Sequence, residues 1–299
     1  MVAPIKIGPG IQIGSGVNVG LSGTPPVAGG WTAGGSLNTA RCKLAGAGTQ
    51  SAGLAMGGQS VSGYTALTEE YDGTAWSAGG NLNATNIGLA GAGTQTAALG
   101  FGGYTSGFSA TTEEYDGSAW TAGGSMGTAR AYLGGAGTQT AGLGFGGYGN
   151  SNITPATEEY NGSAWTAGGN MNTTRQKLAG CGTQSAGLAF GGYTSTIVSA
   201  ATEEYDGSVW TNGGSMNLAR NYPGGAGAQS AGLAFGGTIP GGPGAQSATE
   251  EYNGTVWSTV NNMGTARAYL GSAGSQPAAL AIGGSIDAAI SAATEEYTQ

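Results

Sequence analysis

Paired carboxylates are the first groups in this chain that could do chemistry. All twelve glutamates lie in six Glu-Glu-Tyr triplets, and an arginine follows a tryptophan by ten residues at five places. A pair of carboxylates can serve as general acid and base, and a ring of arginines can bind an anion. Adjacent residues of a β-strand point to opposite faces of a sheet, however, so the two glutamates of a pair would not share one substrate.

These charged residues belong to a repeat of 44, 45 or 47 residues. The triplets end at Tyr71, Tyr115, Tyr160, Tyr205, Tyr252 and Tyr297. The repeated tryptophans are Trp31, Trp76, Trp120, Trp165, Trp210 and Trp257. A glycine doublet begins at Gly57, Gly102, Gly146, Gly191, Gly236 and Gly283. A period of this length indicates a repeat architecture, in which each unit buries its apolar faces against its neighbours.

Each unit contains the signals of four antiparallel strands, a to d. In the third unit, residues 129–147 form two β-prone runs around a turn near residues 137–139. Residues 156–165 form a second hairpin, centred on Asn161-Gly162. Asn-Gly or Asp-Gly between such runs predicts a tight turn in which both central residues take positive φ. No segment has a sustained helical period. Four strands per unit of this length predict a propeller blade.

The landmarks resemble those of the kelch family of β-propellers: a glycine doublet closes strand b, a tyrosine lies in strand c and a tryptophan in strand d. The resemblance covers residues 27–299 and implies an all-β, six-bladed kelch-type propeller. Trp31 has no triplet before it, and the triplet ending at Tyr297 has no tryptophan after it. We therefore expect residues 27–32 to supply the outer strand of the last blade, so that the two ends of the repeat region close the ring.

Repetition favours a structural role for the charged residues and tryptophans, because an active site needs only one copy. One glutamate of each pair is expected to face the space between blades and meet an arginine, and the other to be solvated. The tryptophans are expected to make blade-to-blade contacts. Asn86 fills the sixth arginine slot, so Glu69–Glu70 or a neighbouring pair must be satisfied differently. The repeated arginines are Arg41, Arg130, Arg175, Arg220 and Arg267. The alternative is a ring of arginines near the axial mouth that binds an anion.

Composition argues against several functions. Histidine, the commonest metal ligand and general base, is absent. We therefore expect a non-enzymatic protein with no catalytic residues, metal or cofactor. A net charge of −8 with eight basic residues disfavours nucleic acid and anionic membranes as partners. Neither a membrane-spanning stretch nor a secretory signal is visible. Cys42 and Cys181 fall in opposite units and are expected to be buried and unbridged.

The b–c loops are the parts of the repeat that diverge, whereas the a–b and c–d turns are nearly invariant. These loops are residues 59–65, 104–109, 148–155, 193–199, 238–246 and 285–290. Scaffolds carry function on such loops, so they predict a binding face for a glycan or a protein, with neutral drift as the alternative. The candidate ligand-binding residues are Tyr64, Tyr104, Phe108, Tyr148, Asn150, Ile153, Tyr193, Ile197 and Ile239.

Residues 1–26 stand outside the repeat as a separate segment. Short β-prone triplets separated by glycine recur there with a six-residue period, and they cannot bury a core alone. We expect an attachment arm that adds strands to a partner or to copies of itself, with a flexible tail as the alternative. Its candidate anchoring residues are Ile5, Ile7, Ile11, Ile13, Val17 and Val19. Such an arm before a glycine-rich, cysteine-poor repeat head resembles the appendage and decoration proteins of bacteriophage particles.

That resemblance implies a virion structural protein: a tail, fibre or capsid appendage on the particle surface. The arm would then bind other virion proteins or form a homo-oligomer. The propeller would bind a host-surface glycan or neighbouring subunits. The alternative is a free-standing kelch-type interaction module of a bacterial or cellular protein.

Overall fold

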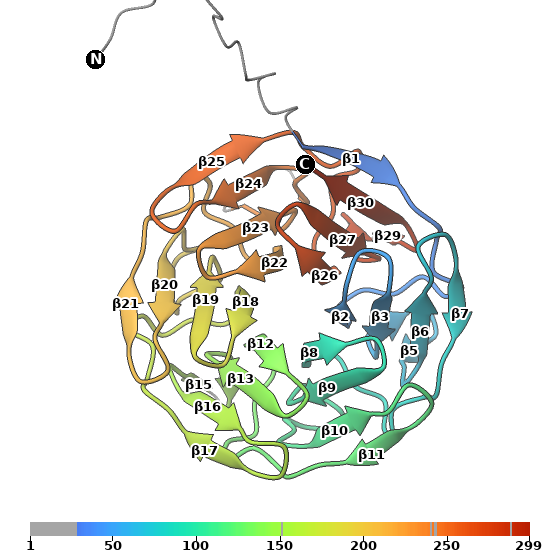
Figure 1. Cartoon of the computed structure of the whole chain (residues 1–299), viewed down its shortest axis with the longest axis horizontal. Coiled ribbons are helices and arrows are strands. Elements are labelled where there is room, and N and C mark those ends of the chain that lie inside the picture. The colour runs from blue at the N-terminus through green and yellow to red at the C-terminus, as the bar shows by residue number, and fades with distance from the viewer. Residues whose placement is uncertain (1–28, 151, 240, 242–243, 288) are drawn as a thin grey trace, which may run out of the picture.

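The chain folds into a six-bladed β-propeller, as the repeat predicts (Figure 1). This computed structural model describes residues 29–150, 152–239, 241, 244–287 and 289–299. Six antiparallel sheets of four strands each surround a central axis. In the described part of the chain, no helix is long and apolar enough to span a membrane.

The strands of a blade are ordered from the axis outward. The inner strands a are β2 (Ala45–Gly48), β8 (Ala90–Thr94), β12 (Gly134–Thr138), β18 (Ala179–Thr183), β22 (Gly224–Ala228) and β26 (Gly271–Ser275). Strands b are β3 (Gly53–Met56), β9 (Ala97–Phe101), β13 (Ala141–Phe145), β19 (Ala186–Phe190), β23 (Ala231–Phe235) and β27 (Ala278–Ile282). Strands c are β6 (Thr68–Tyr71), β10 (Thr112–Tyr115), β16 (Thr157–Tyr160), β20 (Thr202–Tyr205), β24 (Thr249–Tyr252) and β30 (Thr294–Thr298). The outer strands d are β7 (Trp76–Ala78), β11 (Trp120–Ala122), β17 (Trp165–Ala167), β21 (Trp210–Asn212), β25 (Trp257–Val260) and β1 (Gly30–Ala33). We number the blades one to six in the order of their inner strands.

Short hairpins extend three of the b–c loops: β4 (Gln59–Ser60) with β5 (Gly63–Tyr64), β14 (Tyr148–Gly149) with β15 (Asn152–Ile153), and β28 (Ser285–Ile286) with β29 (Ala289–Ile290). Because the strands are antiparallel, the b–c loops and the d–a connectors share one face of the ring, which we call the loop face. The a–b and c–d turns share the opposite face, the turn face.

Both ends of the described chain build the sixth blade, which confirms the predicted closure. Strand β1 pairs antiparallel with β30, with Trp31 opposite Tyr297. In Figure 1 the blue strand β1 lies on the outside of the red strands β30, β27 and β26. The ring thus ends in the same four-stranded order as every other blade.

The c–d turns differ from the predicted two-residue type. Positive φ occurs at the glycine, as at Gly73 with φ 92°, but not at the preceding Asp72. The Asp72 carboxylate instead accepts hydrogen bonds from the backbone N–H of Thr74 (2.9 Å) and of Ala75 (2.8 Å). The hydrogen bond from the Thr74 hydroxyl, together with these two backbone bonds, lowers the pKa of Asp72 to about 2. An Asp side chain can hold a four-residue turn in this way, so the aspartate caps the turn with its side chain and needs no left-handed backbone.

The hydrophobic core lies between neighbouring blades. Each repeated tryptophan donates its indole N–H to a strand-c threonine of the preceding blade, over 2.8–3.0 Å, as Trp120 does to Thr68. The glutamine of each a–b turn was not singled out from the sequence. Its amide donates to two backbone oxygens of the preceding blade, as Gln139 does to Ala98 and Tyr115 (3.1 and 2.7 Å). These contacts recur at all six blade interfaces.

Candidate binding site at the axial mouth and loop face

The repeated arginines lie inside the scaffold. Each guanidinium is fully buried and pairs with the first glutamate of a triplet over 2.9–3.2 Å. Arg41, on the connector into blade one, pairs with Glu69 and also donates to the carbonyls of Gly57 and Leu67 (both 2.7 Å). Burial lowers the pKa of Arg130 and Arg220 to about 10, and their glutamates oppose that shift, so both stay charged at neutral pH. These buried pairs join five of the six connectors to the blades they enter, and the paired arginines are not available at the mouth to bind an anion.

Asn86 occupies the same place in blade two. Its amide donates to the carbonyl of Gly102 (2.9 Å), and Glu113, the first glutamate of this blade, pairs with no arginine among the described residues. The carboxylate accepts instead from the backbone N–H and the side-chain amide of Asn83 (2.8 and 2.6 Å). The pair that is satisfied differently is therefore Glu113–Glu114.

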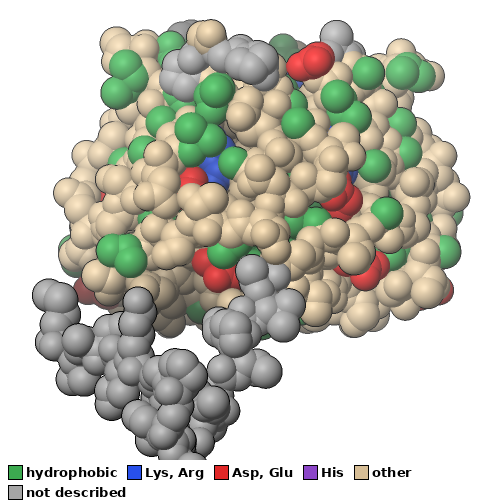
Figure 2. All heavy atoms as spheres, turned by 90° about the horizontal axis from the view of Figure 1, so that it is seen from above, with side chains coloured by type: hydrophobic (Ala, Val, Ile, Leu, Met, Phe, Trp, Pro, Cys, Tyr) green, Lys and Arg blue, Asp and Glu red, His purple; other side chains and the backbone are tan. Residues whose placement is uncertain are grey.

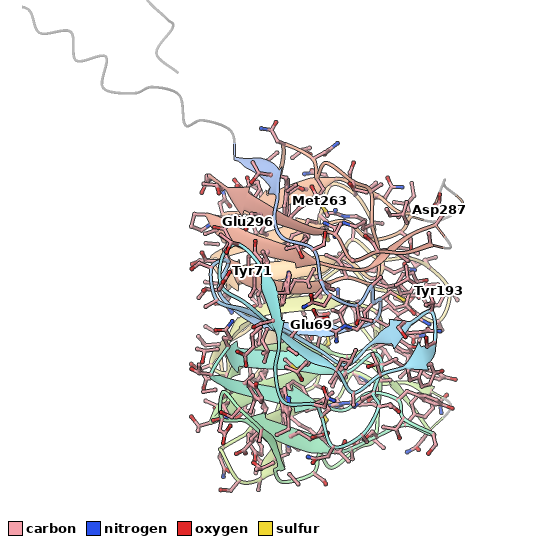
Figure 3. The ribbon with its side chains drawn as sticks, turned by 90° about the vertical axis from the view of Figure 1, so that its right-hand side faces the viewer. Glu69, Tyr71, Tyr193, Met263, Asp287 and Glu296 are labelled. Atoms are coloured by element: carbon pink, nitrogen blue, oxygen red, sulfur yellow. The ribbon has the colours of Figure 1, made fainter. Side chains whose placement is uncertain are left out.

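The second glutamate of each pair is not simply solvated, and that expectation was wrong. Its carboxylate accepts a hydrogen bond of 2.5–2.6 Å from the triplet tyrosine of the next blade. Glu296 of blade six accepts from Tyr71 of blade one, and Figure 3 shows the two side by side. Burial and this bond raise the pKa of Tyr71 to about 12, so the phenol remains a donor. Both glutamates of every triplet are thus used by the scaffold.

One position per blade, twelve residues after the tryptophan, forms a ring around the axis at the loop face. We call it the axial ring: Lys43, Gly88, Tyr132, Lys177, Tyr222 and Tyr269. All six residues have left-handed backbone, with φ of 52–61°. The backbone N–H of Lys43 donates to the carbonyl of Tyr269, and four further members donate likewise to the preceding member, over 2.7–2.9 Å. These bonds tie the connectors of successive blades together and fix where the six side chains start.

The side chains of the axial ring meet over the mouth. The ring centroid of Tyr222 lies 3.9 Å from that of Tyr269 and 5.8 Å from that of Tyr132. The Lys177 ammonium lies 5.2 Å from the ring centroid of Tyr222 and 5.3 Å from that of Tyr193. Lys43 donates to the side-chain oxygen of Gln59 (2.9 Å). Cations and aromatic faces therefore share one small area.

A cavity of about 220 Å³ runs along the axis and is lined by the axial ring and the inner strands. Its wall is largely backbone, because the partly exposed positions of the inner strands are mostly glycine. A Cβ at Gly46 would lie 2.4 Å from the carbonyl oxygen of Ser272 on the neighbouring inner strand, so the blades could not approach so closely with larger residues. The side chains that can recognise a ligand here come from the axial ring.

The b–c loops add aromatic residues around the mouth. Tyr64, Tyr104, Phe108 and Tyr148 form a chain of edge-to-face contacts, with centroids 6.3, 5.5 and 5.3 Å apart along it. We call these four residues the aromatic arc. Tyr64 is 41% exposed, whereas the other three rings are half-buried. The structure therefore brings four of the candidate loop residues together and places Tyr193 beside Lys177 of the axial ring.

The remaining candidate loop residues lie apart from that cluster. Ile197 is 63% exposed, Asn150 is exposed, and Ile153 and Ile239 are half-buried on their own loops. In the edge-on view of Figure 2, hydrophobic side chains project along the upper edge. The anchoring candidates Ile5, Ile7, Ile11, Ile13, Val17 and Val19 lie outside the described residues.

The tyrosines that take no part in the contacts between blades lie on the loop face. All seven tyrosines outside the triplets belong to the axial ring or the b–c loops. The hydroxyls of Tyr132, Tyr222 and Tyr269 have no hydrogen-bond partner among the described residues, whereas every triplet tyrosine has one. Burial raises the pKa of each of the three and lowers that of Lys177. The phenols therefore remain hydrogen-bond donors around the lysine.

No protein-family model matches the chain, and no curated protein matches it. The assignment as a six-bladed β-propeller therefore rests on the sheets themselves.

Such a fold suggests an interaction module. Within the described residues no group of three or more Cys, Asp and Glu side chains could hold a metal ion. Cys42 and Cys181 are buried free thiols, as expected.

The axial ring was missed in the sequence, although it leaves a signal there. Two residues after each arginine slot, one position reads Lys, Gly, Tyr, Lys, Tyr and Tyr, and a leucine follows it in five of the six units. The position before it also varies, so the signal of the axial ring is the recurrence of lysine and tyrosine and not variation alone.

Proposed function

We infer that this protein is a non-enzymatic binding protein of the kelch propeller type, which displays its loop face to a surface glycan. On the resemblance noted above, we place it on a bacteriophage particle as a tail, fibre or capsid appendage. Residues 1–26 would attach it to other virion proteins or to copies of itself.

The binding role is supported by one observation: the residues that hold the blades together differ from those that lie on the loop face. The repeated Trp, Tyr, Glu, Arg and Gln residues hold the blades together, and the tyrosines outside the triplets, Phe108 and both described lysines lie on the loop face. Aromatic rings beside hydrogen-bonding groups suit a sugar, which has apolar C–H faces and polar hydroxyls. Full use of the carboxylates by the scaffold favours binding over hydrolysis.

We expect a glycan array probed with the full chain to show saccharide binding that depends on the aromatic arc. Replacement of Tyr104 or Phe108 by Ala should weaken that binding about tenfold, because each removes an aromatic contact from the centre of the arc. Val256→Ala is the matched control, since Val256 is 51% exposed on a c–d turn of the opposite face. Binding that survives both aromatic substitutions but falls with Val256→Ala would place the site on the turn face and reject this assignment.

Deletion of residues 1–24 should abolish incorporation into particles while leaving saccharide binding intact. The expected cause is the loss of the β-prone triplets that would add strands to a partner. The measurement is the amount of the chain that purifies with particles from cells expressing the full or the shortened form. Equal incorporation of both forms would reject the anchoring role and favour a free-standing kelch-type interaction module.

A further inference from the structure

We propose that the axial mouth recognises the acidic group of its saccharide: Lys43 and Lys177 bind a carboxylate, and the tyrosines of the axial ring hold the sugar that carries it. This inference rests on the proposed glycan-binding function and names the class of glycan.

The two lysines of the axial ring differ from the arginines in having no counter-charge in the described part of the chain. Among the described residues, the five arginines are all paired with glutamates, whereas Lys43 and Lys177 have no carboxylate partner. Both lysines are half-buried members of the axial ring. A chain of net charge −8 thus leaves two cations of the axial ring without a counter-charge, and a ligand carboxylate would supply one.

Hydrogen-bond donors surround these cations. The Lys177 ammonium contacts the rings of Tyr193 and Tyr222, an attraction to aromatic faces that leaves its N–H groups available. Lys43 donates one bond, to Gln59, of the three that an ammonium can donate. The hydroxyls of Tyr132, Tyr222 and Tyr269 add donors that no described residue accepts. The site offers many donors and few acceptors, as a carboxylate requires.

The backbone of the axial ring also indicates a function for its side chains. It has a left-handed conformation, which glycine adopts freely and which is unfavourable for other residues. Gly88 shows that glycine fits this position, yet the other five members are lysines and tyrosines. Unfavourable backbone conformations of this kind are concentrated at functional sites, where the function of the side chain requires them. The scaffold contacts described above use none of these five side chains, so recognition of a ligand is their remaining role.

The positions of the aspartates favour the loop face as the place where an anion binds. Asp72, Asp116 and Asp206 lie exposed on the turn face, at the c–d turns. Asp287 is the exception on the loop face, in the b–c loop of blade six, and Figure 3 shows it on the same side of the molecule as Tyr193. Neither Lys43 nor Lys177 forms an ion pair with Asp287 among the described residues.

The test compares acidic saccharides with their carboxyl-reduced forms. Hyaluronan oligosaccharides, oligogalacturonate and sialyllactose, each beside its reduced form, are titrated against the full chain by calorimetry. At least one acidic form should bind about tenfold or more tightly than its reduced form, since a hydrogen bond to a charged group is the stronger kind. The Lys43→Gln/Lys177→Gln double variant should lose this preference and keep the weaker binding of the reduced form. Lys177→Arg should retain part of the preference, because it keeps the charge, and thermal melting confirms that each variant is folded.

Other results would overturn the inference. Equal binding of acidic and reduced forms by the native chain would refute it while leaving the proposed glycan-binding function intact. An unchanged preference in the double variant would place the acidic group elsewhere. Polyglutamate that binds as tightly as the acidic saccharide would show recognition of a carboxylate-rich protein, and so reject the sugar. Absence of binding to any saccharide, acidic or neutral, would instead refute the proposed function itself.

Discussion

A chain that begins at residue 34 is expected to melt more than about 10 °C below a chain that begins at residue 29. The two chains differ by strand β1, which supplies the outer edge of blade six. Trp31 in this strand contacts Phe235 at a centroid distance of 4.9 Å and donates to the Thr249 hydroxyl (3.0 Å). Trp31 is partly buried, and loss of a tryptophan side chain from a core costs up to about 3–5 kcal/mol, to which the loss of the strand pairing adds; each kcal/mol shifts the melting of a domain of about 200 residues by roughly 2–4 °C.

The measurement is calorimetric or dichroic melting of both chains at equal concentration. The shorter chain should also aggregate more readily, because β30 then presents an unpaired edge. Trp31→Ala in the longer chain separates the indole contacts from the strand pairing, and it should give an intermediate melting temperature. Identical melting of the two chains would contradict closure of the ring by β1.

Arg175→Met is expected to lower the free energy of unfolding by about 3–5 kcal/mol. Arg175 and Glu203 are both fully buried and 2.9 Å apart, so the substitution leaves a carboxylate without its counter-charge. It also removes the donor to the carbonyls of Gly191 (2.9 Å) and Ala201 (2.6 Å). Urea titration of the native and substituted chains measures the loss.

The double variant Arg175→Met/Glu203→Gln is the control, and it should recover part of the stability because no buried charge remains. If the single and double variants lost the same stability, the loss would come from packing and not from the unpaired carboxylate.

Blade two offers the reverse substitution. Asn86→Arg should raise the free energy of unfolding, since Glu113 is already buried and the arginine would pair with it.

The sequence predicted the fold from local signals that the repeat multiplies. Strand alternation, glycine doublets and Asp-Gly turns each act within a few residues, and the unmatched Trp31 and Tyr297 revealed how the ring closes. The structure confirms this part because strands and their order depend on such local patterns.

Contacts between blades were harder to foresee. The bond from Tyr115 to Glu70 joins residues 45 positions apart, and it depends on how far neighbouring blades are rotated about the axis. No local pattern gives that rotation, so the second glutamate was assigned to solvent. The axial ring was missed for a related reason, since its left-handed backbone arises from the blade-to-blade hydrogen bonds of the connectors.

The repeated backbone wall of the cavity has a consequence for how the ligand specificity of such a molecule can change. Most contacts that hold the blades together come from residues that recur in the units, and the side chains of the axial ring come from one position per unit. A mutation at one of these positions, or an exchange between two nearly identical units, would give a new combination of side chains on an unchanged frame. Selection for binding to a new ligand could thus proceed through six positions, with little loss of stability at each step.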